Sequence, residues 1–353
     1  MIACAGVTVA ALTVVALNCS SLAAQVPVLT EQDAHTTALF QAVSVSASNP
    51  RLAWISGHAG TWARTMNGGA TWESHVMQGH DSLQFRDVHV AADGSQAWLM
   101  AAGTGARSGI FHTIDAGETW TQVFVNKDTA AFYDCMAFWD DRRGFAFSDA
   151  VNGRTPIVRT DDGIQWTLSS IPAQDGEGGF AASGGCAQAS RTTGDAWMGT
   201  GAAANPRVRH SVDRGRTWSD VVVPLAAGSG AGTTAIAFRD RKHGVAVGGV
   251  IGGTGSGPRI ARTTDAGATW LVVNEPPFAG AIYGAAYTRA LGKDILVAVG
   301  PGGAAWSVND GDSWAMLDAK AYWSVGFGRN GSGWLVGPQG RVVRLEWRRE
   351  PKG

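Results

Sequence analysis

Four arginines stand in four long, glycine-rich loops of this sequence, and their side chains are the clearest candidates for binding chemistry. The residues are Arg107, Arg154, Arg207 and Arg259, in segments 101–109, 148–156, 200–207 and 248–259. A guanidinium group binds a carboxylate through two parallel hydrogen bonds, so several on one surface could hold an acidic peptide or another carboxylate. The alternative hypothesis is that each arginine is a solvated turn residue.

Metal and phosphate chemistry find little support in the sequence. His75, His80 and Asp81 fall within seven residues. Their spacing matches no common metal site, so a surface loop is the preferred interpretation. The glycine-rich loops lack the Lys-Ser/Thr pair that follows the glycines of a phosphate-binding loop. We therefore predict no metal site and no cofactor.

Catalytic chemistry is not the preferred interpretation either. A glycosidase needs two carboxyl groups that face each other across its substrate. The available carboxylates are Asp134 and either Asp175 or Glu177, and nothing in the sequence brings them together. We therefore predict no catalytic residue.

An eight-residue pattern of the form Thr-x-Asp-x-Gly-x-Thr-Trp recurs along the chain. Its six copies occupy residues 65–72, 113–120, 159–166, 211–218, 263–270 and 307–314. An Asp or Asn at the third place can accept backbone N–H groups of a turn, and Gly at the fifth place can take φ > 0. The pattern is the Asp-box, or bacterial neuraminidase repeat. The residues predicted to fasten these turns are Asn67, Asp115, Asp161, Asp213, Asp265 and Asn309.

Short apolar strands precede each Asp-box and set the predicted architecture. Seven of them have the same form, at 52–57, 97–103, 144–149, 196–201, 244–249, 295–300 and 333–338. Each follows another short strand, the first six precede two more, and the Asp-box tryptophans recur every 44 to 52 residues. We therefore predict an all-β fold, a seven-bladed β-propeller of four-stranded antiparallel blades with Asp-box turns.

The seventh blade lacks a fourth strand in the linear order. Residues 341–347 supply its third strand, and no Asp-box follows. A closed ring must not leave a sheet edge open, so another segment has to fill the place. Residues 25–30 (QVPVLT) alternate like a short edge strand, and we predict that they pair with residues 341–347.

Composition and the N-terminal segment indicate an exported monomer. The net charge of −1 over 353 residues gives no footprint for nucleic acid. Residues 2–17 are almost wholly apolar and are followed by small residues at 20–24, as in a signal peptide. We expect a signal peptide at 1–24, one propeller at 25–348 and a C-terminal tail at 349–353, in the periplasm or secreted. Lipidation at Cys19 is the alternative.

Two cysteines remain after export, Cys135 and Cys186. An oxidising compartment favours a disulfide between them. They occupy the same place on successive repeats, as Asp87 does, and equivalent side chains point the same way around a ring. The expectation is therefore two buried thiols, with a disulfide as the alternative.

The blades resemble the photosystem II stability and assembly factor family of propellers over roughly residues 39–347. The motifs are GVAVGG with IARTTDAGATW, GFAFSD with IVRTDDG, and GWLVGPQGRVVRLEW. The arginines that match the family position ahead of the Asp-box are Arg64, Arg159, Arg262 and Arg344. Three blades depart from this pattern, with His112, His210 and Trp306.

The resemblance implies a non-catalytic scaffold whose Arg-lined face binds a membrane-protein partner. Sialidases share the Asp-box, but they need an arginine triad and a Tyr–Glu pair on six blades, which this sequence does not offer. We expect an exported scaffold that binds a protein or peptide partner, in some settings a membrane-associated one, through one loop rim. The alternative is a glycan-binding or sialidase-like glycoside-hydrolase propeller.

Overall fold

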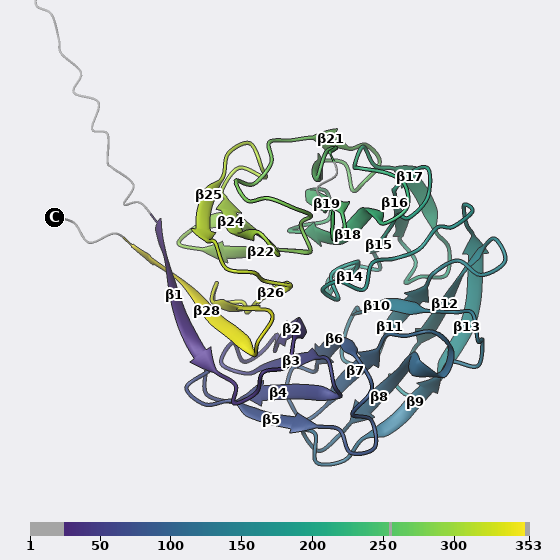
Figure 1. Ribbon diagram of the computed structural model, residues 1–353, viewed down its shortest axis with the longest axis horizontal. Helices are drawn as coiled ribbons and strands as arrows, with labels where there is room; N and C mark the ends of the chain where they lie inside the picture. Colours follow the sequence, from purple (N-terminus) through teal and green to yellow (C-terminus); the bar gives the residue numbers. More distant parts are fainter. Residues whose placement is uncertain (1–24, 254–255, 350–353) are drawn as a thin grey trace, which may run out of the picture.

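The chain forms a ring of seven antiparallel sheets around a central channel (Figure 1). The computed structural model describes residues 25–253 and 256–349. Each sheet has four strands, so the predicted seven-bladed propeller is confirmed. Within the described residues, no helix has the length and apolar character needed to cross a membrane.

Each blade runs from an inner strand at the channel to an outer strand at the perimeter (Figure 1). Blades 1 to 3 are β2 (Phe40–Val45), β3 (Ala53–Gly57), β4 (Thr61–Thr65), β5 (Glu73–Val76); β6 (Phe85–Val90), β7 (Ala97–Ala101), β8 (Gly109–Thr113), β9 (Thr121–Val125); and β10 (Tyr133–Phe138), β11 (Gly144–Ser148), β12 (Arg154–Thr160), β13 (Trp166–Pro172). A short 3-10 helix, η1 (Gly105–Arg107), lies between β7 and β8.

The other blades follow the same order. Blades 4 to 6 are β14 (Ala187–Ala189), β15 (Ala196–Thr200), β16 (Arg207–Ser211), β17 (Ser219–Val222); β18 (Ala231–Phe238), β19 (Gly244–Val250), β20 (Ile260–Thr263), β21 (Leu271–Val272); and β22 (Gly284–Ala290), β23 (Lys293–Gly300), β24 (Gly303–Ser307), β25 (Ala315–Asp318). Blade 7 consists of β26 (Ser324–Phe327), β27 (Gly333–Val336), β28 (Arg341–Arg349) and β1 (Gln25–Asp33).

The hydrophobic core is divided among the seven contacts between neighbouring blades. Seven separate clusters of buried residues each combine side chains from two adjacent blades. Strands β3, β7, β11 and β15 are buried along their whole length. These continuous apolar strands have a blade on each side, so both of their faces leave water on folding.

The Asp-box turns are fastened by their own side chains, as the sequence predicts. In blade 5, Asp265 Oδ1 accepts hydrogen bonds from Thr269 N (2.9 Å) and Thr263 Oγ1 (2.8 Å). The other carboxylate oxygen accepts from Thr269 Oγ1 (2.6 Å). Ala266 and Gly267 both have positive φ, which the tight corner requires. Asn67 and Asn309 make the equivalent bonds with their amide oxygens.

Blade 3 departs from the prediction, because its fastening residue is Asp162 and not Asp161. Asp162 Oδ1 accepts the N–H groups of Ile164 (2.8 Å) and Gln165 (2.7 Å), while Asp161 pairs with the Arg159 side chain. This turn is one residue shorter than the others, with a single positive φ, at Gly163. Because the eight-residue pattern was aligned on Trp166, the missing residue shifted the predicted fastening position from Asp162 to Asp161.

The Asp-box turns also join neighbouring blades. The Trp98 indole of blade 2 donates to Gly163 O of blade 3 (2.8 Å), and Trp197 of blade 4 donates to Ala266 O of blade 5 (3.1 Å). Three of the four arginines at the family position also join neighbouring blades. Arg64, Arg262 and Arg344 each donate to a turn carbonyl of the following blade.

Strand β1 occupies the fourth place of blade 7 and so links the two ends of the chain. It pairs antiparallel with β28 through nine residues, from Gln25 opposite Arg349 to Asp33 opposite Arg341. The pairing includes the segments that the sequence analysis matched, and both strands run longer than expected. Gln32 Oε1 accepts the indole N–H groups of Trp72 of blade 1 (2.9 Å) and Trp334 of blade 7 (2.8 Å).

Cys135 and Cys186 form a disulfide, so the expectation of two buried thiols is wrong. Their Cα atoms lie 5.7 Å apart, a normal separation for a disulfide. Side chains at this place do point the same way around the ring, and that direction leads into the next blade. Asp87 at the equivalent place in blade 2 accepts Met136 N–H of blade 3 (2.7 Å). Inner strands converge at the channel, so the neighbouring cysteine is within reach.

We predict that Asp162→Ala lowers the free energy of unfolding by about 1–3 kcal/mol, because the N–H groups of Ile164 and Gln165 lose their acceptor. Asp161→Ala is the matched control, one residue away. It removes only an exposed ion pair and should cost less than about 1 kcal/mol. Chemical denaturation of both variants measures the difference. Equal effects would contradict the assignment of Asp162 as the fastening residue.

Deletion of residues 25–33 should lower the melting temperature by roughly 10 °C or more, because blade 7 loses its outer strand and Trp72 and Trp334 lose a shared acceptor. Thermal unfolding followed by circular dichroism measures the change. Removal of residues 350–353 is the control and should have little effect. Similar melting temperatures for both truncations would contradict closure of the ring by β1.

Candidate functional site

The channel is covered at one end by residues 178–185, here called the plug. The plug belongs to the connection between blades 3 and 4, and besides its bonds to those two blades it contacts blades on the other sides of the channel. Gln41 Nε2 of blade 1 donates to Ala182 O (3.3 Å), and Arg86 of blade 2 donates to Ala181 O (3.2 Å). On the far side, Ser183 Oγ donates to Tyr283 O (2.6 Å) and Ser183 O accepts from Ser324 Oγ (3.0 Å). The plug therefore spans the channel mouth.

Polar residues at β-bulges surround the plug. The inner strands β2, β6 and β10 each carry one extra residue near their start, namely Gln41, Arg86 and Asp134. A bulge leaves the extra residue out of the ladder and re-aims its side chain. Asp134 lies directly against the plug, because a Cβ on Gly179 would be 2.6 Å from the Asp134 carboxyl carbon. Only glycine fits beside this acid.

Asp134, which is buried, and Asp149, which is half-buried, form an acid pair next to Gly179 of the plug. Burial, together with the neighbouring Asp149 carboxylate, raises the pKa of Asp134 well above its usual range. Burial raises the pKa of Asp149 to about 6, against the opposing hydrogen bonds from Asp134 and Gly179 N–H. Two negative charges in a desolvated site repel each other and are poorly solvated, so the pair holds a proton at neutral pH.

Arg86 and Arg107 line one small pocket beside the plug, with a volume of about 120 Å³. The Arg86 guanidinium lies 5.9 Å from the centre of the Phe132 ring and donates to Gln84 Oε1 (2.9 Å from Nε). Arg107 is exposed at the end of η1. Within residues 25–253 and 256–349, neither arginine forms an ion pair with a carboxylate. Two cations without a paired anion make this pocket suited to a carboxylate.

The other predicted arginines do not join this pocket, so the four do not converge on one site. Arg207 is ion-paired with Asp220 of its own blade. Arg259 is ion-paired with Glu275 (2.7 Å) and also donates to backbone carbonyls. Arg154 is exposed and donates to Ser170 Oγ and Ser170 O (both 2.7 Å).

The two acidic residues of the loop before blade 4, Asp175 and Glu177, differ in burial and in their partners. Glu177 is buried and ion-paired with the equally buried Arg209 (2.9 Å), and it accepts a hydrogen bond from Thr200 Oγ1 (2.6 Å). Asp175 is exposed. The sequence did not bring Asp134 together with either residue, and the structure pairs Asp134 with Asp149 instead.

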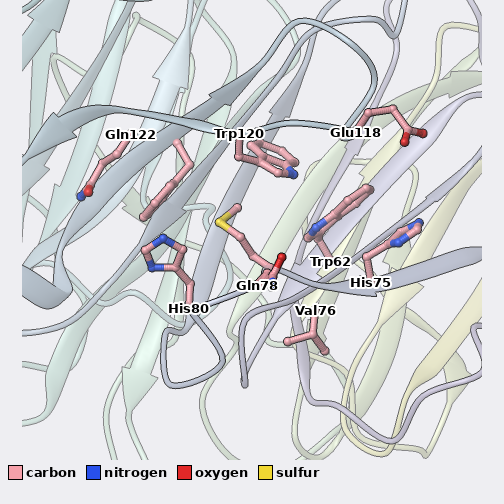
Figure 2. Close-up of a pocket in the computed structure, with 11 residues that line it drawn as sticks. Trp62, His75, Val76, Gln78, His80, Glu118, Trp120 and Gln122 are labelled. Carbon is pink, nitrogen blue, oxygen red and sulfur yellow. The ribbon is translucent and has the colours of Figure 1, made fainter.

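His75 and His80 line a pocket of about 380 Å³ between the outer parts of blades 1 and 2 (Figure 2). His75 stacks on Trp62 with ring centres 4.5 Å apart, and His80 meets the Phe111 ring at 4.8 Å. Among the described residues, no group of three metal-ligating side chains is present. Both imidazoles are engaged in ring contacts rather than gathered around one point.

Trp62 does not offer a free indole face in this pocket. Trp62 stacks on Trp54, with ring centres 4.8 Å apart, and also on His75. Figure 2 shows His75 beside Trp62. Sugar-binding sites commonly use exposed aromatic faces, so Trp62 gives no support to the glycan alternative. Its packing indicates a role in the contact between blades 1 and 2.

A family model for the photosynthesis system II assembly factor YCF48 matches residues 27–131. The chain is a propeller similar to this family. The match begins in β1 and ends just before β10, so it covers the closing strand and the first two blades. The resemblance proposed from the sequence is confirmed. No curated relative matches the sequence.

Solved propellers share the architecture at low sequence identity. A structure described as YCF48 bound to D1 peptide is 16% identical, covers 90% of this chain and 96% of its own, and gives a TM-score of 0.57. YCF48 from Cyanidioschyzon merolae is 15% identical, with coverage of 90% and 98% and a TM-score of 0.61. The Pan2 WD40 domain of Neurospora crassa is 10% identical, with coverage of 90% of each chain and a TM-score of 0.60. These likenesses establish the fold.

Sequence reasoning found Arg107 and missed Arg86, its neighbour in the pocket. A signal was present, since the inner strands of blades 1 to 3 begin Phe40-Gln41, Phe85-Arg86 and Tyr133-Asp134. A polar residue directly after an aromatic one, at the same place in three repeats, marks the bulges that face the plug. Asp149 carried no such signal, because its partner is defined only by the packing.

The acid pair should make stability depend on pH. The folded protein holds protons on Asp134 and Asp149 to a higher pH than the unfolded chain does, so this stabilisation is complete below about pH 4. The contribution of Asp149 is lost as the pH rises through about 6, and the contribution of Asp134, whose pKa is raised well above its usual range, is lost as the pH rises further. Asp134→Asn removes one ionisable group and keeps the shape of the side chain. Its unfolding free energy, relative to the unmodified protein, should rise by about 1–3 kcal/mol between about pH 5 and 8.

Chemical denaturation across this pH range measures the effect, and Asp175→Asn is the control, because Asp175 is an exposed acid in the same loop. The control should follow the unmodified protein at every pH. A profile of Asp134→Asn parallel to that of the unmodified protein would show that the pair holds no proton in the fold.

Proposed function

We propose that this chain is an exported, non-catalytic propeller that binds a protein or peptide partner through the rim around the plug. The observation that carries the proposal is the pocket with two guanidinium groups, Arg86 and Arg107, neither of which is ion-paired with a carboxylate in the described part of the chain. An acidic side chain or a C-terminal carboxylate would satisfy both cations. Arg86 is half-buried, which makes its charge-assisted hydrogen bonds stronger than those at a fully exposed site.

The family match supports a binding role over a catalytic one. The matched model describes an assembly factor, and one structural neighbour is described as bound to a peptide. Near the mouth, Glu177 is ion-paired with Arg209, and Asp134 lies against Gly179 of the plug. A partner that inserts a carboxylate beside Arg86 would also contact the plug, because Arg86 donates to Ala181 O.

Export is supported by the disulfide and by the N-terminal sequence. Structural disulfides form and persist in oxidising compartments, and Cys135 and Cys186 are bridged. The apolar segment at residues 2–17 lies outside the described residues, and its interpretation as part of a signal peptide stays a prediction. A periplasmic or secreted location would place the rim where membrane-associated partners expose their chain ends.

Selection of binders from a library of random peptides with free carboxyl termini tests this function. We expect the enriched peptides to be acidic, and Arg107→Gln to weaken their binding by about tenfold, as the loss of a charge-assisted hydrogen bond predicts. Arg142→Gln is the matched control, because Arg142 is also exposed, in the turn between β10 and β11 at the opposite rim. Calorimetry with one synthetic binder and its C-terminal amide gives the affinities.

The result that would overturn the proposal is the absence of any enriched peptide. Binding that is insensitive to Arg107→Gln would move the site away from the rim pocket. Binding to immobilised glycans without binding to peptides would favour the glycan alternative.

A further inference from the structure

A groove on the perimeter of blades 2 and 3 is lined by both apolar and polar side chains. Its volume is about 860 Å³, and its walls come from β9 of blade 2 and from β12 and β13 of blade 3. Phe124 and Trp166 are half-buried in the walls, whereas Leu168 and Val125 are exposed at 66% and 49%. Exposed apolar side chains along a groove of this size indicate an interaction surface.

The two outer strands that flank this groove lack the charges that protect most sheet edges. Neither β9 (TQVFV) nor β13 (WTLSSIP) contains a charged residue. The outer strands β5, β17 and β25 carry Glu73, Asp220 and Asp318, and β21 has only two residues. Among the outer strands of blades 1 to 6, β13 is the longest, with seven residues. An uncharged, extended edge is a template for another strand.

Charge at the groove defines what kind of strand would fit. Arg154 lines the groove, and its side chain is hydrogen-bonded to Ser170 without a carboxylate ion pair among the described residues. Lys127 and Asp128 are the other charged residues of the lining. Two cations face one anion, so the groove is complementary to an acidic segment.

The groove adjoins the rim pocket proposed above as the partner site. Asn126 lines the groove and donates through Nδ2 to Gly105 O (3.0 Å), within the helix η1 that ends at Arg107. It also donates to Ala131 O (3.2 Å), next to Phe132 of the rim pocket. Asn126 therefore links the wall of the groove to the backbone that forms the rim pocket.

We propose that this groove binds one extended, acidic segment of the partner polypeptide as an added strand along the free edge of β13. An apolar side chain of the segment lies between Phe124 and Trp166, and an acidic side chain or terminal carboxylate meets Arg154. Backbone hydrogen bonds to an open sheet edge give affinity in this mode, while the pockets select the side chains. The inference rests on the proposed function, because it assumes a peptide partner, and it adds the location and conformation of the bound segment.

The experiment uses peptides enriched on the full-length protein from the same library. Leu168→Lys places a charge on the edge of β13 and should weaken binding by about tenfold. Leu271→Lys is the matched control: Leu271 lies on the outer strand β21 of blade 5 and is exposed at 69%, against 66% for Leu168. It should change affinity by less than about twofold. Val125→Lys, on the other wall, gives a second measurement, and thermal unfolding checks that each variant is folded.

Hydrogen exchange with and without a synthetic binder adds a direct readout. The proposal requires protection of β13 amides on binding, and it requires Arg154→Gln to weaken an acidic binder more than its neutral analogue. Peptide binding that is lost with Arg107→Gln and unchanged by Leu168→Lys would overturn the groove and leave the proposed function intact. Failure to enrich any peptide would instead count against the proposed function itself.

A second copy of this chain is the other possible occupant, and sedimentation analysis distinguishes it. Monomers at every concentration agree with the proposal. A dimer that Leu168→Lys converts to monomers would overturn it, since the groove would then be an interface between copies.

Discussion

The structure depends on closing a ring, and that closure is made by one antiparallel pairing between the two ends of the chain. Nine residues of β1 lie along β28, and no other strand of the described chain could complete blade 7. Each of the seven core clusters is shared by two blades, so a blade has no complete core of its own. If the ring opened between blades 7 and 1, the cluster around Trp72 and Trp334 would be exposed to water. Gln32 of β1 binds both indoles at this point.

The repeated parts of the fold could be predicted from the sequence because each repeat contains the same kinds of turn and strand residues. Six Asp-boxes and seven apolar strands fix the number of blades, and the spare strand at residues 25–30 follows from counting. Asp161 was chosen in place of Asp162 because both are aspartates and the shorter turn keeps the same glycine and tryptophan. Pattern matching cannot see a deletion inside a motif when its flanks still fit.

The contacts at the channel could not be predicted from the sequence, because they join residues that do not occupy equivalent positions in the repeats. The plug joins Ala182 to Gln41 and Ser183 to Ser324, each across 141 positions. The acid pair depends on how closely Gly179 approaches Asp134. The sequence gives the direction of the two cysteine side chains correctly. It does not give the distance between the inner strands, and that distance allows Cys135 and Cys186 to form a disulfide. Arg107 was found as a loop residue, but its pairing with Arg86 comes from packing.

The register of β1 and β28 also determines how the molecule responds to force. Gln25 is the partner of Arg349, so the two ends of the described chain leave the ring at one corner (Figure 1). A pull applied between these two points loads the hydrogen bonds one pair after another, as in peeling, whereas a pull along the strands would load all of them together. A propeller held at both ends would therefore open at blade 7 under a small tension, while the disulfide between blades 3 and 4 keeps the opposite side of the ring intact.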